Sequence, residues 1–194
     1  MKTAGIILAA GESRRMGRAK AFLPFRGGTF LSTLAGTFEQ FCSPVIAVFG
    51  FDGDAAARNS PDRVIPVINR EYRSGMLTSL QAGLRAIDLQ VIDRVLFTLV
   101  DHPAVSAETV AALVATEADI VIPRLNGKRG HPVLMRAALA SEYLDEPGDA
   151  KVRDAIDRHA DRILYVDVDD PGIRDDVDDP AVYEALLARE AARI

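Results

Sequence analysis

The chain has 194 residues, of which 48% are hydrophobic and 26% are charged, a balance typical of one globular domain with its own core. Its formal net charge of −5 argues against general nucleic-acid binding, because phosphate backbones require a basic protein face. A single cysteine, Cys42, excludes an intrachain disulfide, and its apolar neighbours predict a small buried hydrophobe.

The apolar run at residues 1–10 resembles the start of a signal peptide. It is too short for that role, and it runs directly into the basic residues Arg14, Arg15, Arg18 and Lys20. No window of the sequence approaches the length needed to span a bilayer. We therefore expect a cytoplasmic protein without membrane contacts.

Along the chain, short apolar runs rich in β-branched residues alternate with longer segments of helical periodicity. Most of the short runs are continuous, as expected of strands covered on both faces. This alternation predicts one α/β domain over residues 1–194, a Rossmann-like three-layer sandwich with a mostly parallel sheet and helices on both faces. The predicted strands are Thr3–Ala9, Pro44–Phe49, Val64–Val67, Val95–Val100, Ile120–Pro123 and Ile163–Val166. The predicted helices are Phe30–Phe41, Ala55–Asn59, Met76–Ile87, Ala107–Ala115 (with Ser106 as N-cap), Arg136–Leu144, Val152–His159 and Pro180–Ala192.

A glycine-rich basic loop follows the first predicted strand. Gly11 and Gly17 allow sharp turns that bring backbone amides close to an anion, and four cations lie within the same loop. The spacing fits neither a Walker A loop nor a G-x-G-x-x-G fingerprint. A phosphate-binding loop and a solvated basic turn both remain compatible with the loop taken alone. Its position after a buried strand favours phosphate binding, because ligands of such sheets bind beyond the C-terminal strand ends.

Asp101 occupies the equivalent position after the predicted strand Val95–Val100. A charge there is costly unless it faces a cleft or a partner, so Asp101 is a candidate metal ligand. A turn or capping aspartate before Pro103 is the alternative. If the two strands are neighbours, Asp101 and the basic loop converge.

Several motifs together resemble the MobA/MocA-like nucleotidyltransferases. They are Leu8-Ala9-Ala10-Gly11-x-Ser13-x-Arg15-Met16-Gly17-x-x-Lys20, Gly75-Met76-x-x-Ser79-Leu80-x-x-Gly83-Leu84, Asp101-His102-Pro103, Gly130-His131-Pro132-Val133-Leu134, Gly148-Asp149-x-x-x-Arg153 and Asp176-Val177-Asp178-Asp179-Pro180. The resemblance implies a fold of the nucleotide-diphospho-sugar transferase type. It also implies Mg²⁺-dependent transfer of a nucleoside monophosphate from an NTP to a small phosphorylated acceptor. Ala9-Ala10-Gly11 and Gly130-His131-Pro132 are more similar to the cytidylyl branch, whose substrates are CTP and molybdopterin and whose partner could be a molybdoenzyme or its chaperone.

The resemblance also implies roles for individual residues. The nucleotide-binding set is Leu8, Ala9, Ala10, Gly11, Ser13, Arg15, Lys20, Gly75 and Ser79. Arg15, Lys20 and Asp101 are the expected catalytic residues, Asp101 and Asp176 the metal ligands, and His131, Asp149 and Arg153 the acceptor-binding residues. Gly75 with Ser79, and His131, are equally compatible with purely structural roles in a turn or at a helix start. Asp178 is the alternative to Asp176, and we expect it to point the other way if the segment is extended.

Two positions depart from the family pattern. Lys151 replaces a glycine of the Gly-Asp-x-Gly-Ala-Arg motif and adds bulk and charge where the acceptor is expected, which puts molybdopterin in question. His102 replaces the usual glutamine after the metal aspartate. A guanylyltransferase, a sugar- or polyol-phosphate nucleotidyltransferase and a non-catalytic nucleotide sensor therefore remain as alternatives.

Overall fold

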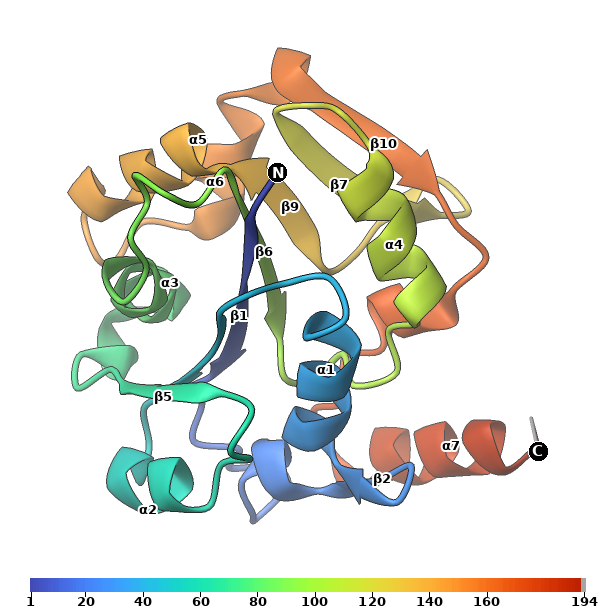
Figure 1. Cartoon of the computed structure of the whole chain (residues 1–194). Helices are drawn as coiled ribbons and strands as arrows, with labels where there is room; N and C mark the ends of the chain where they lie inside the picture. Colours follow the sequence, from blue (N-terminus) through green and yellow to red (C-terminus); the bar gives the residue numbers. More distant parts are fainter. Residues whose placement is uncertain (193–194) are drawn as a thin grey trace.

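The computed structural model describes residues 1–192 and shows a three-layer α/β sandwich around one twisted sheet (Figure 1). The strand order is β10-β7-β9-β6-β1-β4-β5, with β8 paired to β7. The pairs β1–β4, β1–β6, β4–β5 and β7–β10 are parallel, while β9 is antiparallel to both β6 and β7. The predicted fold class, a mostly parallel sheet with helices on both faces, is confirmed.

The strands of the sheet are β1 (Thr3–Ala9), β4 (Val45–Phe49), β5 (Ile65–Ile68), β6 (Arg94–Leu99), β7 (Ile120–Leu125), β8 (Lys128–Arg129), β9 (Val133–Arg136) and β10 (Ile163–Asp167). A separate hairpin pairs β2 (Pro24–Phe25) with β3 (Gly28–Thr29). The α-helices are α1 (Phe30–Phe38), α2 (Gly53–Arg58), α3 (Met76–Arg85), α4 (Ala107–Ala115), α5 (Ala137–Glu142), α6 (Val152–Asp157) and α7 (Pro180–Ala191).

The central strand β1 divides the hydrophobic core between the two faces of the sheet. Ile7 packs on one face with α1 and α4, while Ile6 and Leu8 pack on the other with α3, α5 and α6. Alternate residues of a strand point to opposite faces, so a strand with helices on both sides must be apolar throughout. Cys42 is buried in the first of these clusters, as predicted.

The strands at the two edges of the sheet are less covered than the central ones. Ile65 of β5 and Leu164 of β10 are about half exposed, unlike the residues of β1 and β4. Each edge strand has a neighbouring strand on one side only. Its side chains are therefore less enclosed than those of a central strand, although its run of apolar residues is continuous.

Strand β9 corrects the sequence analysis, which predicted a helix beginning at Arg136 and no strand before it. Arg136 ends β9, paired with Arg94 of β6, so α5 begins one residue later and stops at Glu142 before a short 3-10 turn. The predicted N-cap of α4 is confirmed, since the Ser106 side chain accepts a hydrogen bond from the Thr109 backbone N–H.

Candidate active site

The glycine-rich loop leaves the C-terminal end of β1 directly beside the end of β6. Leu8 pairs with Leu99 in the parallel register of these two strands, so the residues that follow each strand emerge together. The convergence of the loop with Asp101 that the sequence predicts is therefore confirmed.

Local backbone bonds hold the loop in a compact turn. The Ser13 carbonyl accepts from the N–H groups of Met16 and Gly17, and the Ser13 hydroxyl accepts from the Lys20 N–H at 3.2 Å. Ser13 and Gly17 both have positive φ, 51° and 66°, which tightens the turn at two points. These bonds fix the loop with Lys20 facing the C-terminal end of β6, where Asp101 lies.

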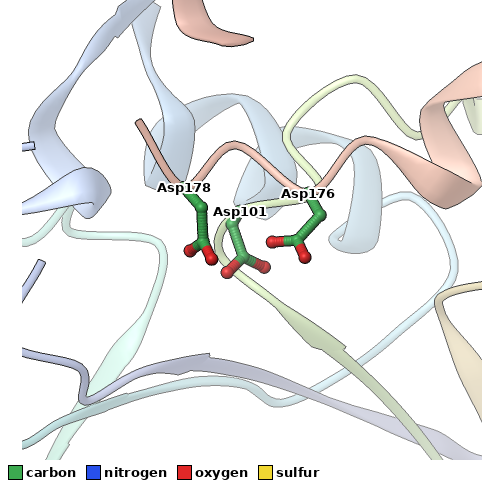
Figure 2. A group of neighbouring side chains, drawn as sticks. All are labelled: Asp101, Asp176 and Asp178. Carbon is green, nitrogen blue, oxygen red and sulfur yellow. The ribbon is translucent and has the colours of Figure 1, made fainter. Parts of the chain in front are cut away.

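Three aspartates form an acidic cluster opposite this loop (Figure 2). Asp101, Asp176 and Asp178 each offer a carboxylate oxygen, and these atoms lie within 4.8 Å of one another. The C-terminal segment is held here because the Val177 N–H donates to the Asp101 carbonyl at 3.1 Å and the Val177 side chain is fully buried.

The expected orientation of Asp178 is wrong. Asp176 and Asp178 both turn toward Asp101 rather than in opposite directions (Figure 2). In an extended segment, residues two apart share one side, and the intervening Val177 enters the core on the other. The segment can therefore supply two carboxylates, where the sequence analysis expected one.

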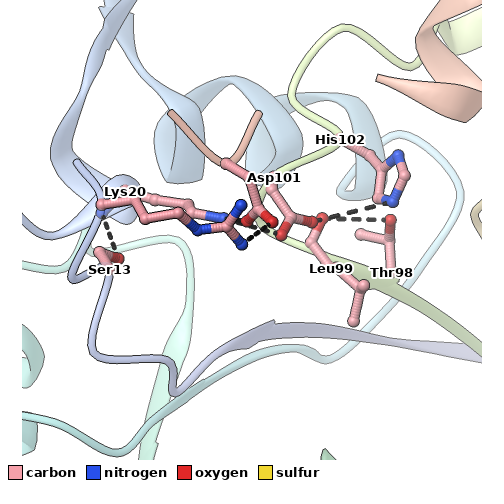
Figure 3. Close-up of polar contacts among 8 residues, drawn as sticks. Ser13, Lys20, Thr98, Leu99, Asp101 and His102 are labelled. Carbon is pink, nitrogen blue, oxygen red and sulfur yellow. Dashed lines mark hydrogen bonds and ion pairs between the residues drawn. The ribbon is translucent and has the colours of Figure 1, made fainter. Parts of the chain in front are cut away.

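Lys20 joins the loop to the acidic cluster. Its ammonium donates to Asp101 Oδ2 at 3.1 Å and also to Asp178, and Arg15 contacts the same Asp178 (Figure 3). Burial opposes the positive charge of Lys20, but the hydrogen bond to Asp178 and the charge of Asp101 outweigh it and raise the Lys20 pKa. Lys20 therefore stays positively charged at the C-terminal ends of β1 and β6.

The cluster carries more negative charge than these two cations neutralise. Burial, followed by the charges of Asp101 and Asp178, raises the pKa of Asp176, whereas the hydrogen bond from Lys20 lowers that of Asp178. One Asp101 oxygen, Oδ1, is buried without a hydrogen-bond partner in the part of the chain that the structure describes. Grouped carboxylate oxygens with unused acceptor capacity are suitable ligands for a hard divalent cation.

A pocket of about 550 Å³ lies between the loop and the cluster. All nine residues of the expected nucleotide-binding set line it, together with Asp101 and Asp178. Asp176 adjoins it through the cluster. Phe51 and Tyr72 add aromatic surface to the pocket wall.

Glu12, which no sequence motif singles out, links residues along one rim of this pocket by hydrogen bonds. Its carboxylate accepts from Arg14 at 2.5 Å, from Arg73 at 2.9 Å and from the Tyr72 hydroxyl at 3.2 Å. These hydrogen bonds, the one from Arg14 foremost, hold the Glu12 pKa at about 2. The family motif leaves this position unspecified, so only the three-dimensional contact with Tyr72 and Arg73 identifies it.

Gly75 and Ser79 lie at the start of α3, beside the pocket. Gly75 has a φ of 141°, and an added Cβ would come within 3.1 Å of the Gly148 carbonyl. Ser79 is buried, and its hydroxyl accepts from the buried Asn69 amide at 3.0 Å. Both residues line the pocket and at the same time hold this corner together, so contacts with a ligand and a structural role are compatible.

The residues expected to bind the acceptor are only partly brought together. His131 and Arg153 line a second pocket of about 160 Å³, together with Arg129, but Asp149 lines neither pocket. Lys151 is exposed just before α6 and also lines neither pocket.

His102 and His131 meet behind the acidic cluster. Their rings are 4.8 Å apart, and His102 Nε2 lies 3.8 Å from Asp101 Oδ1. Burial lowers the pKa of each histidine to about 4; the positive charge of Lys20 adds to this for His102, and the proximity of a second titratable imidazole, His102, adds to it for His131. Both imidazoles are neutral at physiological pH.

Comparisons with known proteins show the family to which the chain is similar. A profile of the MobA-like NTP transferase domain matches residues 5–163. The molybdenum cofactor cytidylyltransferase of Escherichia coli K12 is 30% identical over 154 residues, which cover 78% of this chain and 79% of that protein. A probable molybdenum cofactor guanylyltransferase of Mycobacterium tuberculosis H37Rv is 35% identical over 127 residues, covering 62% of this chain and 61% of that protein.

A solved structure extends the similarity to the whole fold. The crystal structure of a homologue of the Mycobacterium tuberculosis protein Rv0371c, from Mycobacterium sp. strain JC1, superposes with a TM-score of 0.83 at 25% identity and full coverage of both chains. With the relatives above, it defines the present protein as a nucleotidyltransferase. The chain belongs to the family of MobA-like NTP transferases. No helix within residues 1–192 is both long and apolar enough to cross a membrane.

Proposed function

We propose that this enzyme transfers CMP from CTP to molybdopterin in a Mg²⁺-dependent reaction that releases pyrophosphate. One observation carries the proposal: a single 550 Å³ pocket joins the basic glycine-rich loop to a three-carboxylate cluster. A nucleoside triphosphate requires both halves, cations and amides for its phosphates and carboxylates for the metal that accompanies them. The cytidylyl relative from Escherichia coli, which matches most of this chain, supports the choice of CTP and molybdopterin.

In this proposal the loop binds the triphosphate. Arg15 and Lys20 hold the β- and γ-phosphates, with Ser13 and the Gly11 backbone as further donors. A ligand phosphate would then replace Asp178 as the partner of Arg15. Leu8, Ala9 and Ala10 form the wall next to Gly75 and Ser79, which we assign to the nucleoside.

Asp101 and Asp176 would hold the Mg²⁺, with Asp178 as the alternative to Asp176. When bound, the metal would neutralise charge on the phosphates. Asp101 is the ligand supported by most observations, because it belongs to the carboxylate cluster, lines the pocket and contacts Lys20 through Oδ2.

The transfer is an in-line displacement in which the protein mainly positions charge. A terminal phosphate oxygen of the acceptor forms a bond to the α-phosphorus, and the bond from that phosphorus to the bridging α–β oxygen breaks. Pyrophosphate leaves with the electron pair, and Arg15 and Lys20 stabilise the charge it carries. We assign the acceptor to the side of His131, Asp149 and Arg153, next to the second pocket.

A specific observation favours a second candidate, a guanylyltransferase. The mycobacterial relative is 35% identical, although it matches a smaller share of this chain than the cytidylyl relative does. The product would pass to a molybdoenzyme or its chaperone in either case. A sugar- or polyol-phosphate acceptor and a nucleotide sensor are the further outcomes that the experiment below separates.

The experiment measures pyrophosphate release by the purified enzyme with Mg²⁺ and CTP or GTP. Each nucleotide is offered with molybdopterin, with a panel of sugar and polyol phosphates, and without acceptor. We expect release only with CTP and molybdopterin. Release only with GTP moves the enzyme to the guanylyl branch, and release only with a sugar phosphate overturns the molybdopterin assignment. Nucleotide binding without release under any of these conditions indicates a sensor.

A further inference from the structure

Asp101 is held between two groups on opposite sides of its carboxylate (Figure 3). Lys20 contacts Oδ2 at 3.1 Å, and His102 places its ring nitrogen Nε2 at 3.8 Å from Oδ1. The His102 ring is buried and lies outside the group of carboxylate oxygens that are mutually within 4.8 Å. His102 is thus beside the acidic cluster rather than part of it.

Three buried polar atoms that lack hydrogen-bond partners in the described part of the chain lie in this region. Oδ1 of Asp101 and the Nδ1 atoms of His102 and His131 are buried without hydrogen-bond partners within residues 1–192. Buried polar atoms in native proteins are nearly always paired, so each exception requires an explanation, of which a functional role is one. A shortening of the Nε2–Oδ1 distance by about 1 Å would give a normal hydrogen bond and satisfy Oδ1.

His131 supports the His102 ring from behind. The two ring centroids are 4.8 Å apart, and Phe97 lies 6.2 Å from His131 on the strand that leads to Asp101. The His131 backbone N–H donates to the Ile173 carbonyl at 2.8 Å, in the segment that continues to Asp176. His131 is therefore fixed both to the strand before Asp101 and to the segment before Asp176.

We propose that His102 and His131 are positioning residues for the metal-binding carboxylate of Asp101. His102 donates its Nε2–H to Oδ1 and fixes the rotation of the carboxylate, so that Oδ2 faces the cation site. In metal binding His131 acts through His102, whose ring plane it holds. The proposal rests on the assignment of Asp101 as a metal ligand above. Groups that hydrogen-bond to metal ligands in this way typically change metal affinity about ten- to hundredfold when removed.

The test measures binding of Mn²⁺ alone to the ligand-free protein, by the loss of the free-ion signal in electron paramagnetic resonance. Asp101→Asn defines which part of the signal belongs to this site. We expect His102→Ala to raise the Kd for Mn²⁺ about ten- to hundredfold. His102→Gln, which replaces the Nε2 donor with an amide N–H, should restore most of that loss. His102→Met, similar in volume and without a donor, takes the place of the alanine variant if the latter does not fold.

His131→Leu removes the aromatic ring that packs against His102 and keeps the position filled by an apolar side chain. It should weaken Mn²⁺ binding by itself, but the double variant with His102→Ala should bind no more weakly than His102→Ala alone, because coupled residues are not additive. His159, which pairs with Glu142 on a different surface, supplies the matched control His159→Ala, and its Mn²⁺ affinity should equal that of the wild type.

The outcomes separate the two proposals. If Mn²⁺ binding is the same in the wild type and in Asp101→Asn, the metal assignment fails and the positioning role fails with it. If the wild type binds Mn²⁺ at Asp101 and His102→Ala or His102→Met binds it equally well, the positioning role alone is wrong. Additive losses in the double variant would remove His131 from the pair.

Discussion

Among single residues, Asp101 has the largest expected effect on turnover. Asp101→Asn keeps the shape of the side chain and removes the charge, so we expect kcat to fall about a hundred- to a thousandfold, as for other single electrostatic contributors to catalysis. Folding should survive, because the carboxylate faces the pocket rather than the core. Steady-state kinetics over a range of Mg²⁺ concentrations measure the effect.

Asp161→Asn is the control for this prediction, since Asp161 is exposed just before β10, away from the strand ends that carry the site. Normal turnover of Asp101→Asn with an unchanged Mg²⁺ requirement would contradict the metal assignment. The site would then have to be rebuilt around Asp176 and Asp178.

Cys42 gives a second prediction at this scale. Burial raises the pKa of its thiol to about 12, so the reactive thiolate is scarce at neutral pH and the sulfur is inaccessible. We expect a thiol reagent to label Cys42 only after the protein is unfolded in guanidinium chloride. Mass spectrometry counts the label, and rapid labelling of the native protein would show that the first core cluster opens readily.

Site residues that directly follow a predicted strand could be predicted from the sequence. Contacts between residues far apart in the chain could not. The loop residues and Asp101 follow strands directly, so their place at the sheet edge could be inferred from the sequence. Glu12 bonds Tyr72 and Arg73 some sixty positions away, and no local pattern indicates that contact. The joint orientation of Asp176 and Asp178 depends on the burial of Val177 between them, which the sequence analysis did not consider.

At the scale of elements, the start of α6 gives a third prediction. Lys151 occupies the N-cap position, where its side chain accepts no hydrogen bond and its positive charge opposes the helix dipole. Lys151→Ser should therefore stabilise the protein by about 1 kcal/mol in urea unfolding. Because Lys151 is exposed and lines neither pocket, the KM for the acceptor should not change.

Ser106→Ala is the opposite case, since it removes an existing cap from α4 and should cost about 1 kcal/mol. A changed acceptor KM in Lys151→Ser would contradict our placement of Lys151 outside the acceptor site. It would again put molybdopterin in question as the acceptor, because of this departure from the family pattern.

Strand β9 shows why one element of the sheet escaped the sequence analysis. Its four residues, Val133–Arg136, directly precede a helix, and the sequence analysis assigned the last of them, Arg136, to that helix. What makes them a strand is their antiparallel insertion between β6 and β7, a pairing set by distant segments. The buried runs of β1 and β4, in contrast, carry their own signal: β1 was predicted with its observed bounds and β4 with one residue too many at its start.

For the whole molecule, the site is assembled from opposite ends of the chain. The loop after β1 supplies the cations, and the segment before α7 returns from the edge strand β10 to supply two of the three carboxylates. Val177 and Tyr183 pack in the core cluster around α1 and hold this C-terminal segment in place. A ligand that contacts both the loop and the cluster should therefore stabilise the entire fold rather than one element of it.

This leads to the last prediction, which concerns thermal stability. A ligand that binds only the folded state stabilises it by about 2.7 kcal/mol at a hundred times its Kd, which for a domain of this size raises Tm by roughly 5–10 °C. We expect CTP with Mg²⁺ to raise Tm more than GTP with Mg²⁺, measured by differential scanning fluorimetry. Asp101→Asn should lose the part of the shift that requires Mg²⁺. Arg15→Ala should reduce the shift by either nucleotide, since its partner in the complex is the triphosphate. Arg58→Ala, an exposed arginine on α2, is the control and should behave as wild type. An equal or larger shift with GTP would overturn the cytidylyl assignment and leave the nucleotidyltransferase fold and its family membership unaffected.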